Sequence, residues 1–173
     1  MRGGSDMLRL RPYRKSDAEE IISWIGDERI FRFWCADRFD HYPIKSDDLN
    51  GQYESSEGCE DVYHFTAYDE SGIAGHINIR FPDKDDLDTV RFGYVILNDK
   101  MRGQGLGKEM VILAARYAFD IMKAKRITIG VFEENAAALN CYLKAGFEDT
   151  GIVEEYSIGD ETWKCLELEM KHP

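Results

Sequence analysis

A glycine-rich segment between a strand-like run and a helix-like run constrains this chain more than any other feature. Residues 102–108 read Arg-Gly-Gln-Gly-Leu-Gly-Lys and follow the apolar run from Val90 to Leu97. After the loop, apolar residues recur at helical spacing, at Leu106, Met110, Leu113, Ala114, Tyr117 and Ile121. Glycines let backbone N–H groups turn toward one point, and a helix start adds the positive end of its dipole. This order predicts a cradle for an anion, with a tight and closely packed helix start as the alternative.

The spacing of the glycines excludes two better-known loops. A dinucleotide-binding Gly-x-Gly-x-x-Gly would need a glycine where the chain has lysine or methionine. A P-loop would need four residues between its outer glycines and a Ser or Thr after the lysine, and the chain has three residues and a glutamate there. The segment does fit Arg-x-x-Gly-x-Gly, at Arg102, Gly105 and Gly107.

A second motif lies about thirty residues downstream of the loop. After the strand-like run from Arg126 to Phe132, the helix-like segment carries Asn135, Ala138, Tyr142, Lys144, Gly146 and Phe147. Together with the loop, this pattern resembles the GCN5-related N-acetyltransferase (GNAT) superfamily, and most closely its branch of ribosomal-protein N-terminal acetyltransferases. The resemblance covers nearly the whole chain from Met7 and implies one α/β (α+β) domain over residues 7–173. In such a domain a mixed, largely antiparallel sheet of about seven strands is flanked by helices, and a splayed central strand pair binds acetyl-CoA.

The resemblance assigns acetyl-CoA to three segments of the chain. The glycine loop would hold the pyrophosphate, and the main chain just before it would pair with the pantetheine arm. The second helix would add one face, because residues three and seven apart lie on the same side of a helix. The residues implied are Val95, Ile96, Leu97, Arg102, Gly103, Gln104, Gly105, Gly107, Lys108, Asn135, Ala138 and Tyr142.

Two of these residues also have simpler interpretations. Asn135 stands where an N-cap belongs, and capping and a cofactor contact can hold together. Tyr142 is a core aromatic in the simpler interpretation, whereas the resemblance makes it the general acid that protonates the departing thiolate. The general base stays unassigned, because Arg91 stands where some relatives carry a carboxylate. The alternatives are a chain of water molecules or one of the side chains Glu133, Glu134, His76 and Asp88.

The charge of the chain is unevenly distributed. The net charge is −11, yet the segment from Lys100 to Arg126 has seven basic and two acidic residues. This contrast favours a polyanionic cofactor beside the basic segment and a cationic or amine acceptor elsewhere, with solvated surface charge as the alternative. Nucleic acid is not expected as a partner, because the chain as a whole lacks a basic surface. The acids expected to attract the acceptor are Asp83, Asp85, Asp86, Asp88, Glu54, Glu57, Glu60 and Asp61.

The remainder of the chain reads as alternating strands and helices without repeats or linkers. Strands are predicted at 8–12, 62–68, 73–81, 90–97, 126–132, 147–158 and 162–170. A helix is expected to begin after Ser16 as its N-cap, and one or two short helices are expected within 27–61. Two more helices are expected: one follows the glycine loop, and the other begins at Asn135.

Three expectations concern the setting of the protein. Residues 1–6 resemble an expression remnant ahead of a natural start at Met7. No apolar run approaches the roughly 18 residues that cross a bilayer, so a membrane is not expected as a partner. The thiols show neither zinc spacing nor pairing, which favours a cytoplasmic protein without a metal; they are Cys35, Cys59, Cys141 and Cys165.

The resemblance implies an enzyme that moves an acetyl group from acetyl-CoA to a primary amine. The acceptor stays open between a protein N-terminus and a small molecule such as a polyamine, an aminoglycoside-like drug or an amino acid. A non-catalytic acyl-CoA sensor is the alternative, which the retained Tyr142 beside an intact glycine loop disfavours. A homodimer is compatible with the resemblance.

Overall fold

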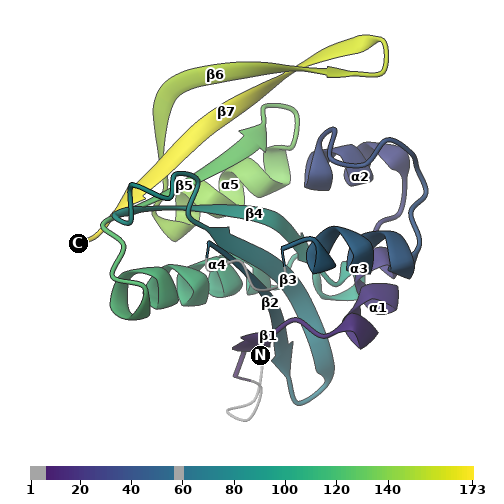
Figure 1. Cartoon of the computed structure of the whole chain (residues 1–173), viewed down its shortest axis with the longest axis horizontal. Helices are drawn as coiled ribbons and strands as arrows, with labels where there is room; N and C mark the ends of the chain where they lie inside the picture. The colour runs from purple at the N-terminus through teal and green to yellow at the C-terminus, as the bar shows by residue number, and fades with distance from the viewer. Residues whose placement is uncertain (1–6, 57–60) are drawn as a thin grey trace.

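The strand-like runs pair into one sheet of seven strands in the order β1-β2-β3-β4-β5-β7-β6 (Figure 1). The computed structural model describes residues 7–56 and 61–173. The strands are β1 (Arg9–Pro12), β2 (Val62–Asp69), β3 (Gly72–Arg80), β4 (Thr89–Leu97), β5 (Arg126–Phe132), β6 (Glu148–Ile158) and β7 (Glu161–Lys171). The α-helices are α1 (Ala18–Ser23), α2 (Glu28–Cys35), α3 (Ser46–Glu54), α4 (Leu106–Arg116) and α5 (Ala136–Ala145).

The sheet is mixed, as predicted, because only one neighbouring pair runs parallel. β4 and β5 are parallel, and the other described pairs are antiparallel. A parallel pair needs a crossover, which α4 supplies across one face of the sheet. On that face α4 packs against β1, β3, β4 and α5. On the other face α2 packs against β4, and α1 against α3.

A β-bulge at Tyr94 divides β4 into two halves. The register with β3 shifts between Gly93 and Ile96, and Tyr94 has a φ of 50°. Phe92, before the bulge, belongs to the core under α4 and α5. Tyr94 and Ile96 belong to the core under α1, α2 and α3. Since side chains two apart in a regular strand share one face, the bulge is what turns the second half of β4 toward the other core.

The first α-helix begins one residue later than predicted. Ser16 lies in a 3-10 turn, and Asp17 precedes α1. The Asp17 carboxylate accepts a backbone N–H from three residues earlier (2.9 Å), the Thr66 hydroxyl (2.8 Å) and both terminal nitrogens of Arg11 (2.8 and 2.9 Å). Burial raises the pKa of Asp17, but these donors, the Arg11 guanidinium foremost, bring it below its usual value. The prediction of Ser16 as N-cap was wrong because this buried ion pair fixes the turn.

The apolar stripe of α4 is also shorter than predicted. Leu106, Met110 and Ala114 are buried, but Ile121 is 66% exposed. Residues 117–121 form a turn of π-helix, which changes the helical repeat. Ala118 and Phe119 point into the core instead.

Two other expectations about local structure are confirmed, one for the segment 27–61 and one for the last two strands. In the described part of the segment 27–61 there are two short helices, α2 and α3, and β6 and β7 form the final antiparallel pair. In the part of the chain that the structure describes, no helix has the length and apolar character needed to span a bilayer. The proposed remnant at residues 1–6 lies outside the described residues, as do Glu57, Cys59 and Glu60.

Candidate active site

β4 and β5 pair along only the first part of β4. Their parallel register ends with Phe92 opposite Ile129, although β4 continues to Leu97 and β5 to Phe132. Beyond that point β4 stays paired with β3, and β5 with β7. The two strands therefore diverge, and none of the described strands pairs with the β5-facing edge of Val95–Leu97. This is the splayed central pair that the family resemblance implies, and it leaves main-chain groups free for an extended ligand.

The glycine loop follows β4 at the end where the strands diverge. Gly103 and Gly105 have φ values of 78° and 79°, in the left-handed region that favours glycine. A Cβ at either position would meet no atom within 4 Å, so backbone conformation and not crowding requires glycine here. Gly105 is the N-cap of α4 and forms no side-chain cap, which leaves the first-turn N–H groups without intrahelical acceptors. These donors and the helix dipole suit a phosphate group, so the loop fits the pyrophosphate of acetyl-CoA.

The polar side chains of the loop differ in their surroundings. Arg102 donates to the carbonyl oxygens of Trp24 (3.0 Å) and Leu97 (3.4 Å), so it ties the loop to the end of α1 and to β4. Gln104 and Lys108 are exposed. Arg102 therefore positions the loop, and Lys108, in the first turn of α4, supplies an exposed cation beside it.

Gly107 joins the three elements of the site by close packing. A Cβ at this position would lie 3.1 Å from Cys141 Sγ on α5 and 3.1 Å from Leu97 Cδ1 on β4. The absence of a side chain thus lets the start of α4 approach both neighbours. The closely packed helix start, the alternative for the whole loop, is therefore the reason for glycine at this one position.

The second motif begins α5. The Asn135 side chain accepts a hydrogen bond from the N–H of Ala138 (3.4 Å), so the capping role is confirmed. Tyr142 lies two turns further on the same face, is 6% exposed and packs against Phe147 with ring centroids 6.2 Å apart. Burial raises the pKa of the Tyr142 hydroxyl, so the group stays protonated at neutral pH.

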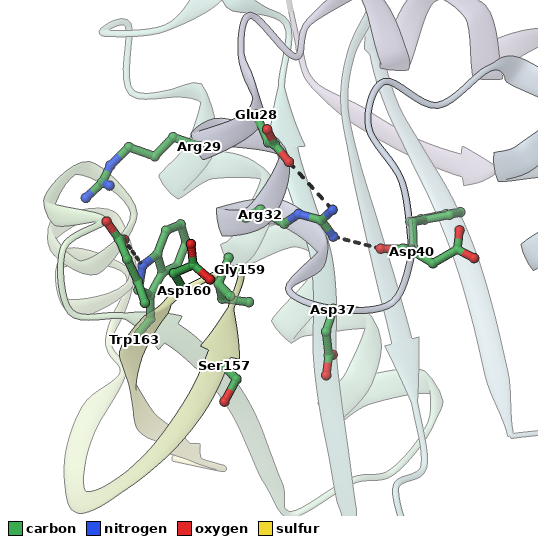
Figure 2. Close-up of a pocket in the computed structure, with 12 residues that line it drawn as sticks. Glu28, Arg29, Arg32, Asp37, Asp40, Ser157, Gly159, Asp160 and Trp163 are labelled. Carbon is green, nitrogen blue, oxygen red and sulfur yellow. Dashed lines mark hydrogen bonds and ion pairs between the residues drawn. The ribbon is translucent and has the colours of Figure 1, made fainter.

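A cavity of about 690 Å³ lies between α2, the segment that follows it and the turn between β6 and β7 (Figure 2). Five carboxylates and two guanidinium groups line it. Trp163 also lines it and packs edge-to-face on Phe132, the last residue of β5, at 5.2 Å between centroids. The cavity therefore adjoins the divergent end of the sheet. Its charged residues are Glu28, Arg29, Arg32, Asp37, Asp40, Asp160 and Glu161.

The carboxylates of the cavity outnumber its arginines, and both arginines also have partners of their own. Arg32 donates to the carbonyl oxygens of Phe39 (2.7 Å) and Ala36 (3.2 Å) and caps the end of α2. Arg29 forms an ion pair with Glu134 and lies over the ring of Trp163 at 5.2 Å. Sequence reasoning missed these residues, since no motif connects α2 with the β6–β7 turn.

The acids expected to attract the acceptor lie elsewhere. The loop with Asp83, Asp85 and Asp86 precedes β4, at the end opposite to the divergence, and Asp88 is ion-paired with Lys125 (2.8 Å). Asp61 directly precedes Val62, the first residue of β2.

Glu54, another of these acids, forms an ion pair with Lys15 (2.5 Å) beside a smaller cavity of about 170 Å³. The register of β4 with β5 places the acidic loop at the end of β4 away from the divergence, so its role toward the acceptor stays a prediction.

The candidate general bases are also separated by the fold. Glu133 and Glu134 follow β5 at its divergent end and are exposed. His76 is fully buried, its Nε2 lies 2.6 Å from the Tyr53 hydroxyl, and burial lowers its pKa to about 3. Asp88 lies at the opposite end of β4. In the part of the chain that the structure describes, no cluster of His, Cys, Asp or Glu could hold a metal ion.

Arg91, which stands where some relatives carry a carboxylate, is held in a partly buried ion pair. Its two terminal nitrogens contact both carboxylate oxygens of Glu167, and one also donates to the Thr128 hydroxyl (3.2 Å). Glu167 comes from β7 and Thr128 from β5, so three strands meet at this point. The site has a guanidinium here instead of a base.

Comparison with known proteins agrees with this geometry. The family model described as Acetyltransferase (GNAT) domain matches residues 7–148. The probable N-acetyltransferase YjcK of Bacillus subtilis is 29% identical over 152 residues, which cover 84% of this chain and 83% of that protein. An N-acetyltransferase 9-like protein of Nematostella vectensis is 27% identical over 144 residues, covering 80% and 73%.

A solved structure shares the fold. The spermidine N-acetyltransferase from Vibrio cholerae, in complex with CoA and spermine, matches with a TM-score of 0.80 over 95% of both chains at 20% identity. The branch within the superfamily stays a prediction. With a matching family model, N-acetyltransferase relatives and a cradle that fits the cofactor, the chain belongs to the GNAT family and is an N-acetyltransferase with acetyl-CoA as its donor.

Proposed function

We propose that this enzyme acetylates a primary amine of a small cationic molecule. The observation that carries the proposal is the divergence of β4 and β5 beside the glycine loop, which leaves strand edge and helix N–H groups free at one place. The residues proposed to hold the donor are Val95, Ile96, Leu97, Arg102, Gly103, Gln104, Gly105, Gly107, Lys108, Asn135, Ala138 and Tyr142.

Tyr142 is the proposed general acid. When bound, acetyl-CoA supplies a thioester whose carbonyl carbon the amine nitrogen attacks, with loss of the sulfur as a thiolate. Tyr142 donates its phenolic proton to that sulfur, the proton of the attacking amine passes to water, and the tyrosinate regains a proton from water. Burial raises the pKa of Tyr142, and the same apolar surroundings would raise the pKa of a thiol beside it, so proton transfer stays feasible. No side chain is proposed as the base.

The proposed acceptor site is the acidic cavity between α2 and the β6–β7 turn. Its carboxylates attract a cation, and its position beside Phe132 leads to the divergent strand ends. A stretch of 55 residues is 33% identical to the spermine/spermidine N(1)-acetyltransferase of Bacillus subtilis and covers 32% of this chain and 36% of that protein. The name of this relative supports a cationic amine as the acceptor.

An acceptor panel tests the proposal. Spermidine, spermine, lysine and peptides with free N-termini are compared by release of the coenzyme A thiol. At least one small cationic amine is expected to turn over, with an apparent KM that rises with ionic strength because salt screens the carboxylates. The proposal is contradicted if the best acceptor is acidic, or if its apparent KM does not change with ionic strength.

A second experiment tests the donor site. Gly105→Glu adds bulk and a negative charge where the phosphate is placed, so calorimetry should show no measurable binding of acetyl-CoA. Gly151→Glu is the matched control, because Gly151 has the same φ of 79° and open space for a Cβ but lies in β6 at the edge of the sheet. Unchanged affinity in Gly105→Glu would remove the glycine loop from the donor site.

A further inference from the structure

Two arginines face each other across neighbouring strands on the acceptor side of the sheet. Arg80 of β3 and Arg91 of β4 are direct partners in the antiparallel register. Like charges at directly opposite positions destabilise a sheet. Arg91 is compensated by Glu167, as described above. Arg80 has no such compensation: within residues 7–56 and 61–173, no carboxylate forms an ion pair or hydrogen bond with it.

The surroundings of Arg80 are positively charged and partly desolvated. Burial lowers the pKa of Arg80, and the charges of Arg91 and Arg38 lower it further. Arg38, from the segment after α2, lies over the ring of Tyr94 with its guanidinium carbon 5.0 Å from the centroid. The Tyr94 hydroxyl is buried and makes no hydrogen bond of ordinary geometry among the described residues, although the Gln52 side chain lies close enough to lower its pKa. Within the described part of the chain, the two guanidinium groups thus have no ion-pair partner, and the hydroxyl has only the nearby Gln52 side chain.

There is open space beside these donors. Gly93 follows Arg91 on the same face of β4, at the point where β5 diverges, and a Cβ there would meet no atom within 4 Å. Arg38 stands between Asp37 and Phe39, which line the large cavity. Arg38, Arg80 and Tyr94 do not themselves line that cavity, so the arginines border it through the chain segment of Arg38.

The charge of these arginines is not placed for the phosphates of the donor. Arg91 lies six residues before the end of β4, which at the rise of a strand is about 20 Å from the glycine loop. Burying an unpaired guanidinium is costly unless a ligand supplies an anion, and a planar guanidinium matches a carboxylate with two parallel hydrogen bonds.

We propose that Arg80, with Arg38 and the Tyr94 hydroxyl, forms a seat for a carboxylate carried by the acceptor. This inference rests on the proposed function and narrows it: the acceptor is an amino-acid-like cation that bears both an amine and a carboxylate. The acidic cavity attracts its positive charge, and the arginine seat orients it by its negative group. A plain diamine would satisfy only the first of these two sites.

The test compares matched acceptors that differ by one carboxylate. Lysine and cadaverine share the same chain and amines, and ornithine and putrescine form a second pair. Wild-type enzyme is expected to show a higher kcat/KM for the carboxylated member of each pair. Arg80→Gln is expected to lower the ratio of kcat/KM for lysine to kcat/KM for cadaverine roughly 10- to 100-fold, which is the range for loss of a hydrogen-bonded charge. Arg80→Lys keeps the charge without the fork and should give an intermediate ratio.

The control is Arg116→Gln, an exposed arginine of α4 on the other face of the sheet, which should leave the ratio unchanged. If Arg80→Gln does not fold by circular dichroism, Arg38→Gln decides the question, because Arg38 is exposed. The proposed carboxylate seat is overturned if the lysine-to-cadaverine ratio of kcat/KM is the same in the wild type and in the variants. If no amine is turned over, the proposed function fails instead. Calorimetry then compares the binding of lysine and cadaverine, and equal affinities would overturn the proposed seat.

Discussion

Gly105→Ala isolates the conformational requirement of the glycine loop. The φ of Gly105 is 79°, and an added Cβ would have no neighbour within 4 Å, so the substitution adds strain without a clash. Placing an L-residue in the left-handed region costs roughly 1–2 kcal/mol. For a chain of this size each kcal/mol corresponds to a change of about 2–4 °C in Tm.

The strain can appear in two measurable quantities. If the variant loop keeps its conformation, the full cost lowers the free energy of unfolding. If the free loop relaxes, binding of acetyl-CoA must restore the left-handed turn, and the affinity falls tenfold for each 1.4 kcal/mol or so. We therefore expect the loss of unfolding free energy in urea and the loss of binding free energy by calorimetry to sum to about 1–2 kcal/mol.

Matched substitutions separate this effect from the general cost of changing a glycine. Gly51 lies inside α3, also without a neighbour within 4 Å of an added Cβ. Gly51→Ala should raise the free energy of unfolding by about 0.5–1 kcal/mol, since alanine is the better helix former. Gly105→Asn should recover part of the loss, because asparagine tolerates the left-handed region. A Gly105→Ala variant with wild-type stability and wild-type affinity would refute the left-handed requirement.

Two further predictions concern single ionisable groups. Tyr142→Phe keeps the packing of the ring, so acetyl-CoA affinity should change little while kcat falls roughly 10²–10⁴-fold; a wild-type kcat under conditions where chemistry limits would exclude the acid role. Because the pKa of His76 is about 3 when folded and about 6.5 when unfolded, the unfolded chain binds the proton first and stability falls as pH falls. Urea unfolding should show a loss of about 2 kcal/mol between pH 6.5 and 5 that His76→Gln reduces and His172→Gln, at an exposed site, does not.

Part of the candidate site can be predicted from local sequence. The left-handed turns at Gly103 and Gly105 and the start of α4 follow from the glycine spacing, because each depends on the backbone preferences of a few adjacent residues. The capping role of Asn135 follows in the same way, since an N-cap bonds within its own first turn.

Expectations failed where distant contacts override local preference. Ser16 has the right chemistry for an N-cap, but Asp17 is held by Arg11 and Thr66, which come from β1 and β2. Ile121 continues the apolar stripe of α4 in sequence, yet a turn of π-helix rotates it into solvent. Neither outcome follows from spacing along the chain, because each depends on how the segment packs.

The sequence by itself determined the family, the left-handed turns of the glycine loop and most of the helices and strands, because glycine spacing and apolar periodicity act within a few residues. Tertiary structure alone decided the surroundings of the proposed acceptor site. The pairing of β4 with β5 stops at Phe92, the bulge at Tyr94 turns the strand toward a second core, and register sets Arg80 opposite Arg91. The acidic cavity likewise joins α2 to the β6–β7 turn. These features depend on which strands become neighbours and in which register, and that choice is made by the packing of the whole sheet.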